Sequence, residues 1–138
     1  MHFKEYINPK LKIVRNGNQF KAYLGETQVG QAYVHPQDKG HWILGAIDVF
    51  NNEDEGGFNY QRKGYGTQLI QAIAAYLKQI GATTLSSSNE GSGTVQILDR
   101  VFGRQNVHHY HAGEPINYDK AVHIMDKDYG YTRTTVHL

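Results

Sequence analysis

The amino-acid sequence predicts one mixed α/β domain whose sheet is twisted and mostly antiparallel. Three observations predict it. Short strand patterns fill the first forty residues, an apolar strand then leads through a glycine-containing turn into an amphipathic helix, and strand-like segments return after that helix. The chain has 138 residues, which is the usual length of one domain. We therefore expect residues 1–138 to form a single domain with two main helices.

The first element is a predicted β-hairpin. Two strand patterns, at 11–15 and 18–24, flank the pair Asn16-Gly17. This pair favours a tight hairpin turn, because both residues tolerate a positive φ angle.

Two further strands complete a predicted meander. The third strand covers 27–34, and we expect the proline-containing segment 35–40 to end it. The fourth strand, 42–50, is apolar on both faces. A strand of this kind is expected at the centre of a sheet, where both of its faces are covered.

The segment that follows predicts an anion-binding turn into a helix. Arg62 and Lys63 stand at the expected start of the helix, where a carboxylate is usual because this end of the helix dipole is positive. Gly64 and Gly66 let the backbone approach a ligand closely. The cations and glycines together indicate a phosphate site on the unpaired N–H groups of the helix. The apolar stripe of this helix consists of Leu69, Ile73, Leu77 and Ile80.

Beyond Gly81 we expect a fifth strand and a second helix. The strand ends at the polar run Ser86-Ser87-Ser88, which suits the lining of a wet cleft better than a sealed core. The helix is predicted at 94–101, with Ser92 as its N-cap.

The C-terminal part predicts only strands. We expect strands at 107–111 and 121–125, and a last hairpin that turns through 126–130 into 131–137. His108, His109 and His111 lie in the first of these strands. Two histidines on one strand face without an evident third ligand make a weak metal site, so we predict no metal.

The phosphate turn resembles a known motif. A Walker loop is absent, and the dinucleotide fingerprint fails because Leu69 occupies the place of its third glycine. The pattern Gln/Arg-x-x-Gly-x-Gly/Ala does fit, and it resembles the pyrophosphate loop of the GNAT superfamily of acetyl-CoA-dependent N-acetyltransferases. The matching residues are Gln61-Arg62-Lys63-Gly64-Tyr65-Gly66.

The resemblance implies a fold, a cosubstrate and a reaction. The fourth and fifth strands would be parallel and splay apart, with the pantetheine arm of acetyl-CoA in the gap. The reaction would be direct attack of an amine on the thioester, with transfer of an acetyl group and no metal. The residues implied in cofactor binding are Val49, Gln61, Arg62, Lys63, Gly64, Tyr65, Gly66 and Thr67, with Asn89 at the end of the fifth strand.

Asp48 is the predicted general base, because attack on a thioester requires a neutral amine. It is the only charged residue in the fourth strand. By simple alternation it shares a face with Trp42, Leu44, Ala46 and Phe50, and such apolar surroundings favour the neutral form of a carboxylic acid. An Asp near a strand end also commonly accepts hydrogen bonds from a turn. The alternative bases are His41, Glu53 and Glu55.

The proton donor is less clearly indicated. In many GNAT proteins a tyrosine of the helix after the fifth strand protonates the leaving CoA thiolate, and the predicted helix 94–101 has none. We take Tyr110 as the candidate, with Tyr65, Tyr118 or a water molecule as alternatives.

Two departures from the family pattern bear on the acceptor. The helices that family members usually carry between the first two strands are missing, which is similar to compact phage and mobile-element acetyltransferases. An acidic insert, 51–58, precedes the phosphate turn, and its carboxylates are expected on the rim of the site. An open, acidic cleft favours a lysine of a partner protein as the acceptor, with a nucleobase or a small polyamine as alternatives. The alternative function is a GNAT-like binding module that has lost catalysis and blocks a macromolecule.

The composition excludes several classes of partner and chemistry. Lys and Arg number 14 against 13 Asp and Glu, so net charge does not indicate a nucleic-acid partner. The sequence has no cysteine, which excludes disulfides and thiolate chemistry. No apolar run reaches membrane length, and the first residues lack a signal-peptide core. We therefore expect a cytoplasmic protein without membrane segments.

Overall fold

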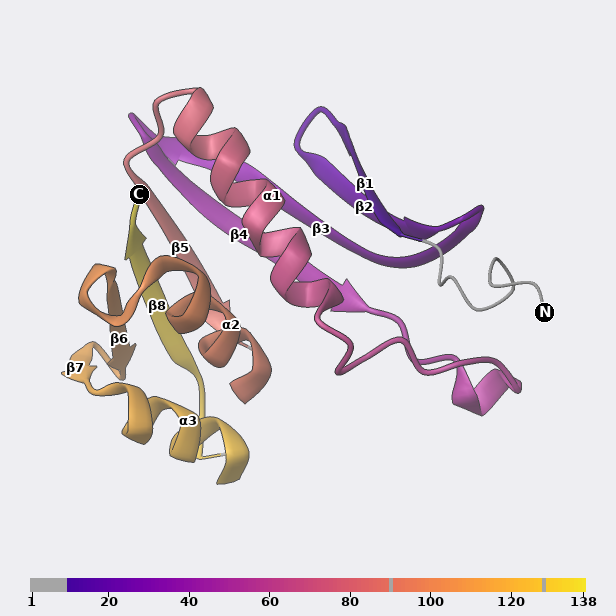
Figure 1. The fold of residues 1–138 in the computed structure, drawn as a ribbon. Helices are drawn as coiled ribbons and strands as arrows, with labels where there is room; N and C mark the ends of the chain where they lie inside the picture. Colours follow the sequence, from indigo (N-terminus) through magenta and orange to yellow (C-terminus); the bar gives the residue numbers. More distant parts are fainter. Residues whose placement is uncertain (1–9, 90, 128) are drawn as a thin grey trace.

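The computed structural model describes residues 10–89, 91–127 and 129–138, which form one eight-stranded sheet and three α-helices (Figure 1). The strand order is β1-β2-β3-β4-β5-β8-β6-β7, and the β4–β5 pair is parallel whereas the other described pairs are antiparallel. This is the predicted mixed, mostly antiparallel architecture. The strands are β1 (Leu11–Asn16), β2 (Gln19–Leu24), β3 (Thr27–Asp38), β4 (His41–Val49), β5 (Thr84–Asn89), β6 (Val107–His111), β7 (Glu114–Ile116) and β8 (Thr132–His137); the helices are α1 (Tyr65–Gln79), α2 (Ser92–Phe102) and α3 (Tyr118–Lys127).

The N-terminal meander agrees with the sequence except at one end. Gly17 has a φ of 62° and turns β1 into β2 as expected. Strand β3, however, does not end at Val34 but continues to Asp38. Pro36 is tolerated because it lies opposite Trp42, beside a register shift. At such an irregularity, the missing backbone N–H of a proline weakens the pairing of the strands little.

A β-bulge at Gly45 reorders the faces of β4. Tyr33 pairs with Ala46 and Val34 pairs with Leu44, so Gly45 is the extra residue. An extra residue shifts the alternation of side chains by one. Asp48 therefore does not share a face with Trp42 and Leu44, and that prediction is wrong. It is an exposed residue on the face away from α1, which we call the outer face.

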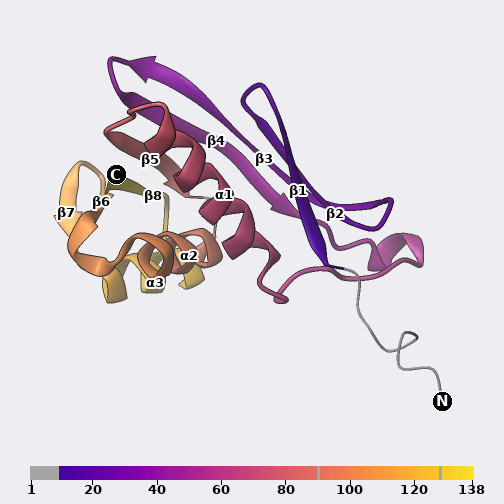
Figure 2. The same cartoon turned by 45° about the horizontal axis from the view of Figure 1, so that its top comes forward.

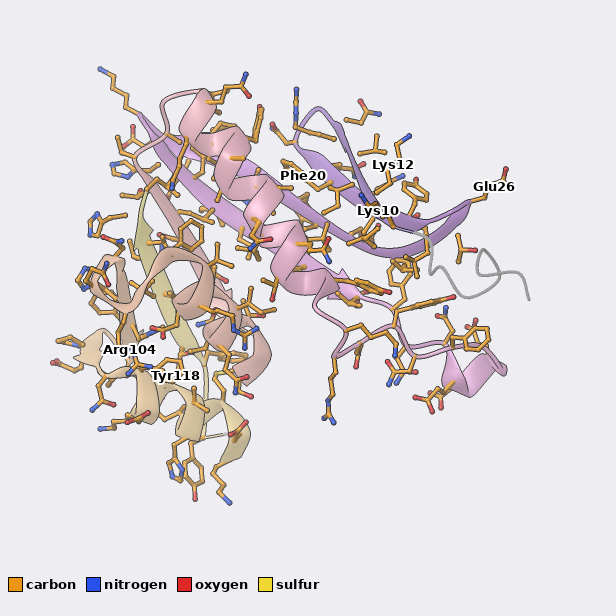
Figure 3. The ribbon with its side chains drawn as sticks, viewed as in Figure 1. Lys10, Lys12, Phe20, Glu26, Arg104 and Tyr118 are labelled. Carbon is orange, nitrogen blue, oxygen red and sulfur yellow. The ribbon has the colours of Figure 1, made fainter. Side chains whose placement is uncertain are left out.

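Helix α1 covers the inner face of the N-terminal half of the sheet. Leu69, Ile73 and Leu77 are fully buried against that face, as the helical spacing predicted. The prediction is wrong for Ile80, which is exposed because the helix ends at Gln79. Phe20 of β2 lies beside α1 (Figure 3), and its ring meets that of Tyr76 edge to face. Burial of each large aliphatic side chain contributes about 1.5–3 kcal/mol. These contacts fix the start of α1 relative to β4.

Helices α2 and α3 cover the same face of the C-terminal half (Figures 1 and 2). Helix α2 begins at Ser92, and its N-cap is Gly91, so the assignment of Ser92 as the cap is wrong. None of the helices described in the structure is long and apolar enough to cross a membrane.

The C-terminal topology differs from the prediction. Segment 121–125 was expected as a strand and lies instead inside α3. The Asn117 side chain accepts a 2.8 Å hydrogen bond from the Lys120 N–H, as an N-cap does, and Ala121 and Ile124 are buried at helical spacing. The predicted last hairpin is wrong too. Strand β8 follows α3 and pairs with both β5 and β6.

A buried histidine joins α2 to β6. His109 is 4% exposed, and its Nδ1 lies 2.9 Å from the Thr134 hydroxyl oxygen. Its Nε2 lies 4.0 Å from Oδ1 of Asp99, which also pairs with Arg104 at 3.3 Å. Arg104 stacks on Tyr118 (Figure 3). Burial lowers the pKa of His109 below its usual 6.5, although the Asp99 carboxylate partly opposes this.

This histidine should make the fold sensitive to mild acid. Below pH 6.5 the unfolded chain takes up a proton that the neutral, buried His109 resists, so stability is complete above pH 6.5 and falls as the pH drops. We expect the urea midpoint to fall more between pH 7.5 and pH 5.5 for the parent than for His109→Gln. Equal losses in the two proteins would show that other groups cause the acid sensitivity.

Candidate active site

The two central strands separate and leave a slot between them. Pairing of β4 with β5 ends at Leu44 and Ser87, beyond which the strands diverge (Figure 1). The Gly45 bulge lies at this point, and a bulge bends its strand. The slot has a volume of about 40 Å³. It is lined by Leu44, Gly45, Ala46, Ile47, Ser87, Ser88 and Thr94.

The turn before α1 presents unpaired backbone N–H groups. The first helical hydrogen bond runs from the Gln68 N–H to the Gly64 carbonyl, so the amides of residues 65–67 have no helical acceptor. Arg62 and Gly64 both have a positive φ, 62° and 84°. Space is open above Gly64, where a Cβ atom would meet nothing within 4 Å. The helix dipole and these amides favour an anion here.

A groove of about 360 Å³ runs between the start of α1 and helix α2. The two helices come close at Gly66, where a Cβ would lie 3.0 Å from Cδ1 of Ile97. Gly66 is therefore needed for close packing of the helices as well as for access to the backbone. The groove is lined by Val49, Arg62, Gly64, Gly66, Thr67, Gly93, Gln96, Ile97 and Arg100.

The structure brings most of the predicted cofactor residues together. Val49, Arg62, Gly64, Gly66 and Thr67 all line the groove.

Three of the predicted residues have other surroundings. The Gln61 side chain donates a 2.9 Å hydrogen bond to the Val49 carbonyl, so it holds the turn against the end of β4. Lys63 is exposed on the turn, and Tyr65 packs partly into the core.

Asn89 lies in the seam between β5 and β8 rather than in the groove. It is 1% exposed, and its Nδ2 donates hydrogen bonds of 2.9 and 2.8 Å to the hydroxyl oxygens of Thr132 and Thr134. Both amide hydrogens are thus used within the protein. Asn89 thus fixes β5 against β8 through its Nδ2. Its Oδ1 is buried and has no hydrogen-bond partner among the described residues, and its role in pantetheine binding stays a prediction.

The predicted catalytic pair is not brought together. Asp48 lies on β4 three residues beyond the bulge, on the outer face. Tyr110 pairs with Arg133, which pairs with Ser88, so it stands two strands away from β5. Two strand spacings are about 10 Å. Tyr110 is accordingly not among the residues that line the slot.

The alternative bases lie away from the slot. His41 is at the opposite end of β4 and hydrogen-bonds the Thr84 hydroxyl. The acidic insert forms a small loop around the 3₁₀ turn η2 (Glu53–Glu55), closed by the Asn51–Asn59 bridge. This loop projects beyond the start of α1, away from α2 (Figures 1 and 2). The expectation that its carboxylates line the rim of the site is not met in the structure.

Several residues of the site were not predicted. Arg100 of α2 reaches Thr67 of α1 with a 3.4 Å contact between Nη1 and Oγ1, which places a third cation beside the phosphate turn. Its position depends on the packing of two helices, which no local pattern reports. Ser87, Ser88 and Thr94 supply the hydroxyl groups of the slot. Only the polar character of the fifth strand indicated them.

The phosphate turn and the parallel strands that separate are the features that the resemblance implied, and a comparison with protein-family models gives the same family. The model of the "Acetyltransferase (GNAT) family" matches residues 6–95, which is more than half of the chain. The chain belongs to the GNAT family. A search of curated proteins found no match.

Solved structures share the GNAT fold with this protein at low sequence identity. A Bacillus subtilis acetyltransferase in complex with CoA has a TM-score of 0.60 at 15% identity, over 94% of this chain and 99% of that one. A putative streptothricin acetyltransferase from Bacillus anthracis, in complex with acetyl coenzyme A, has a TM-score of 0.57 at 12% identity, over 100% of this chain and 69% of that one. The ribosomal-protein-S18-alanine N-acetyltransferase of Escherichia coli has a TM-score of 0.56 at 13% identity, over 89% of this chain and 71% of that one.

Proposed function

We propose that this GNAT protein transfers an acetyl group from acetyl-CoA to an amine, as a single domain that spans residues 1–138. One observation carries the proposal: the groove and the slot form one path. At the start of α2, Gly93 lines the groove and the adjacent Thr94 lines the slot. Along β4, Val49 lines the groove and Ile47 lines the slot. A ligand with a phosphate at one end and a reactive carbonyl at the other fits such a path.

The residues present suit acetyl-CoA. The open amides of residues 65–67 and the side chains of Arg62 and Arg100 would hold the pyrophosphate, because charge-assisted hydrogen bonds to phosphate are strong. In the slot, the edge of β4 that faces β5 is no longer paired, so its backbone groups on that side are free to bond the pantetheine amides, while β3 still pairs with the other edge. The thioester would then lie near Gly45 and Ala46.

The reaction follows from this placement. The acceptor is an ammonium ion at neutral pH, so it first gives a proton to Asp48, directly or through a water molecule. The amine nitrogen then attacks the thioester carbonyl, a C–N bond forms, and the C–S bond breaks as the thiolate leaves. The nitrogen then loses its second proton, which the slot hydroxyls or a water molecule pass on to the leaving thiolate, so that each relay group ends in its starting protonation state. Ser88 and Thr94 are better placed for this transfer than Tyr110.

The acceptor that we propose is a lysine of a partner protein. All three α-helices lie on the inner face, so no helix in the described part of the chain covers the outer face (Figures 1 and 2). A small amine needs an enclosed pocket to bind well, whereas a protein can use a broad, open surface.

Mass spectrometry of reaction mixtures tests the transfer. The protein, acetyl-CoA and lysine-containing peptides or polyamines should yield an acceptor carrying one added acetyl group. If acetyl-CoA binds but no acceptor of any class is modified, the alternative of a catalytically inactive binding module is favoured. The lack of a tyrosine in α2 is the observation that supports this alternative.

The cation on α2 gives a sharp binding prediction. Arg100→Gln should weaken acetyl-CoA binding about tenfold, or ~1.4 kcal/mol, because one charge-assisted phosphate contact is lost. Isothermal titration calorimetry measures this loss. Lys78→Gln removes a cation at the opposite end of α1 and should bind like the parent. Equal affinity in all three proteins would place the phosphates elsewhere.

A further inference from the structure

The outer face carries a hollow next to the slot. Its volume is about 170 Å³, and it lies over β2, β3 and β4. Ala46, which follows the bulge glycine, lines both the hollow and the slot, so the two spaces are neighbours there. The hollow is also lined by Gln19, Lys21, Gln31, Tyr33 and Asp48.

Tyr33 forms the wall at the junction. Its ring lies directly over Gly45, so closely that a Cβ at this position would overlap it. Tyr33 is 43% exposed, and its ring stacks on the His35 ring with 6.4 Å between the ring centroids. Because Gly45 has no side chain, the Tyr33 ring can lie over it, next to the slot that Gly45 lines. Such a surface packs well against the methylene groups and ammonium of an alkylamine.

Opposite charges occupy the two ends of the hollow. Lys21 pairs with Gln31, and Gln31 pairs with Asp48, so the three residues form one row across β2, β3 and β4. Lys21 and Asp48 are thus two strand spacings apart, about 10 Å. No ion pair joins them in the described structure. Each charge is available to a ligand.

We propose that this hollow is the acceptor site, and that it takes the side chain of a lysine followed or preceded closely by an acidic residue in a partner polypeptide. The proposal rests on the proposed function. Asp48 binds the ammonium, Tyr33 covers the aliphatic arm, and Lys21 attracts the neighbouring carboxylate.

The size of the hollow favours one side chain over a whole small molecule. The hollow, at about 170 Å³, is smaller than the pockets of about 300 Å³ and above that hold drug-sized molecules. The remainder of the acceptor must then lie on the open sheet around the hollow. A polypeptide does so readily.

A charge reversal at Lys21 tests the site. Two peptides are compared, each with one lysine, flanked by glutamates in one and by arginines in the other. The parent should have a KM for the glutamate peptide about fivefold lower than for the arginine peptide, and Lys21→Glu should reverse this order. The acetyl-CoA affinity should not change. Lys78→Glu, on α1 and away from the outer face, should keep the parental order.

The outcomes separate this proposal from the previous one. Acetylation of both peptides with an order that Lys21→Glu does not alter overturns the acceptor site and leaves acetyl transfer intact. Acetylation of small amines but of neither peptide also overturns it. Failure of acetyl-CoA to bind overturns both proposals. Reversal by Lys21→Glu alone supports the site.

Discussion

Asp48→Asn is expected to lower the turnover number about 10²-fold, the usual effect of losing a general base. An asparagine keeps the shape of the side chain but does not accept a proton. Asp48 is exposed on the outer face and is absent from the phosphate groove, so the fold and the affinity for acetyl-CoA should be unaffected. Steady-state kinetics at saturating acetyl-CoA measures the loss.

The acidic insert provides the matched control. Replacing Glu53, Asp54 and Glu55 together by their amides removes three carboxylates from a loop that projects away from α2. This triple variant should retain parental turnover. If Asp48→Asn stays within a fewfold of the parent, or if the triple variant loses as much, the assignment of Asp48 as the base is wrong.

Gly45→Ala is expected to lower kcat/KM by about 10- to 100-fold, since small displacements near reacting atoms have effects of this size. The new Cβ would overlap the Tyr33 ring and push it off the sheet, into the space beside the slot. The ring is partly exposed and is free to move outward, so the free energy of unfolding should change by only about 1 kcal/mol or less.

A second substitution tests the cause. If Tyr33 transmits the effect, Tyr33→Ala and Gly45→Ala should be strongly non-additive in kcat/KM. Gly91→Ala is the control, because a Cβ there meets nothing within 4 Å and its φ is −162°. Parental kcat/KM in Gly45→Ala would show that the ring position does not matter.

The sequence predicted the elements whose causes are local. Asn16-Gly17 turns the first hairpin, and the stripe of Leu69, Ile73 and Leu77 fixes the buried side of α1. The phosphate turn could be predicted from the sequence because Gly64, Gly66 and the cation at Arg62 lie within a few residues of one another.

The missed features have causes that lie far apart in the chain. The bulge at Gly45 depends on the register with β3, and it moved Asp48 to the outer face. Arg100 reaches the phosphate turn only because two helices pack together at Gly66.

Weak local patterns account for one further error, at 121–125, and for one contact that the sequence did not predict, at Asn89. Segment 121–125 reads as a strand, but the Asn117 cap and the burial of Ala121 and Ile124 make it a helix. Asn89 stands at the place that the family pattern suggests for a pantetheine ligand, and in the structure its Nδ2 donates to Thr132 and Thr134 of β8. Strand β8 was itself expected in a different pairing.

Thermal unfolding with and without acetyl-CoA tests the central claim most directly. A ligand at 100 times its dissociation constant stabilises the folded protein by about 2.7 kcal/mol, which raises Tm by several degrees in a chain of this size. We expect this rise with millimolar acetyl-CoA and none with adenosine, which lacks the pyrophosphate and the pantetheine arm. An unchanged Tm at millimolar acetyl-CoA would contradict the assignment of the groove and the slot.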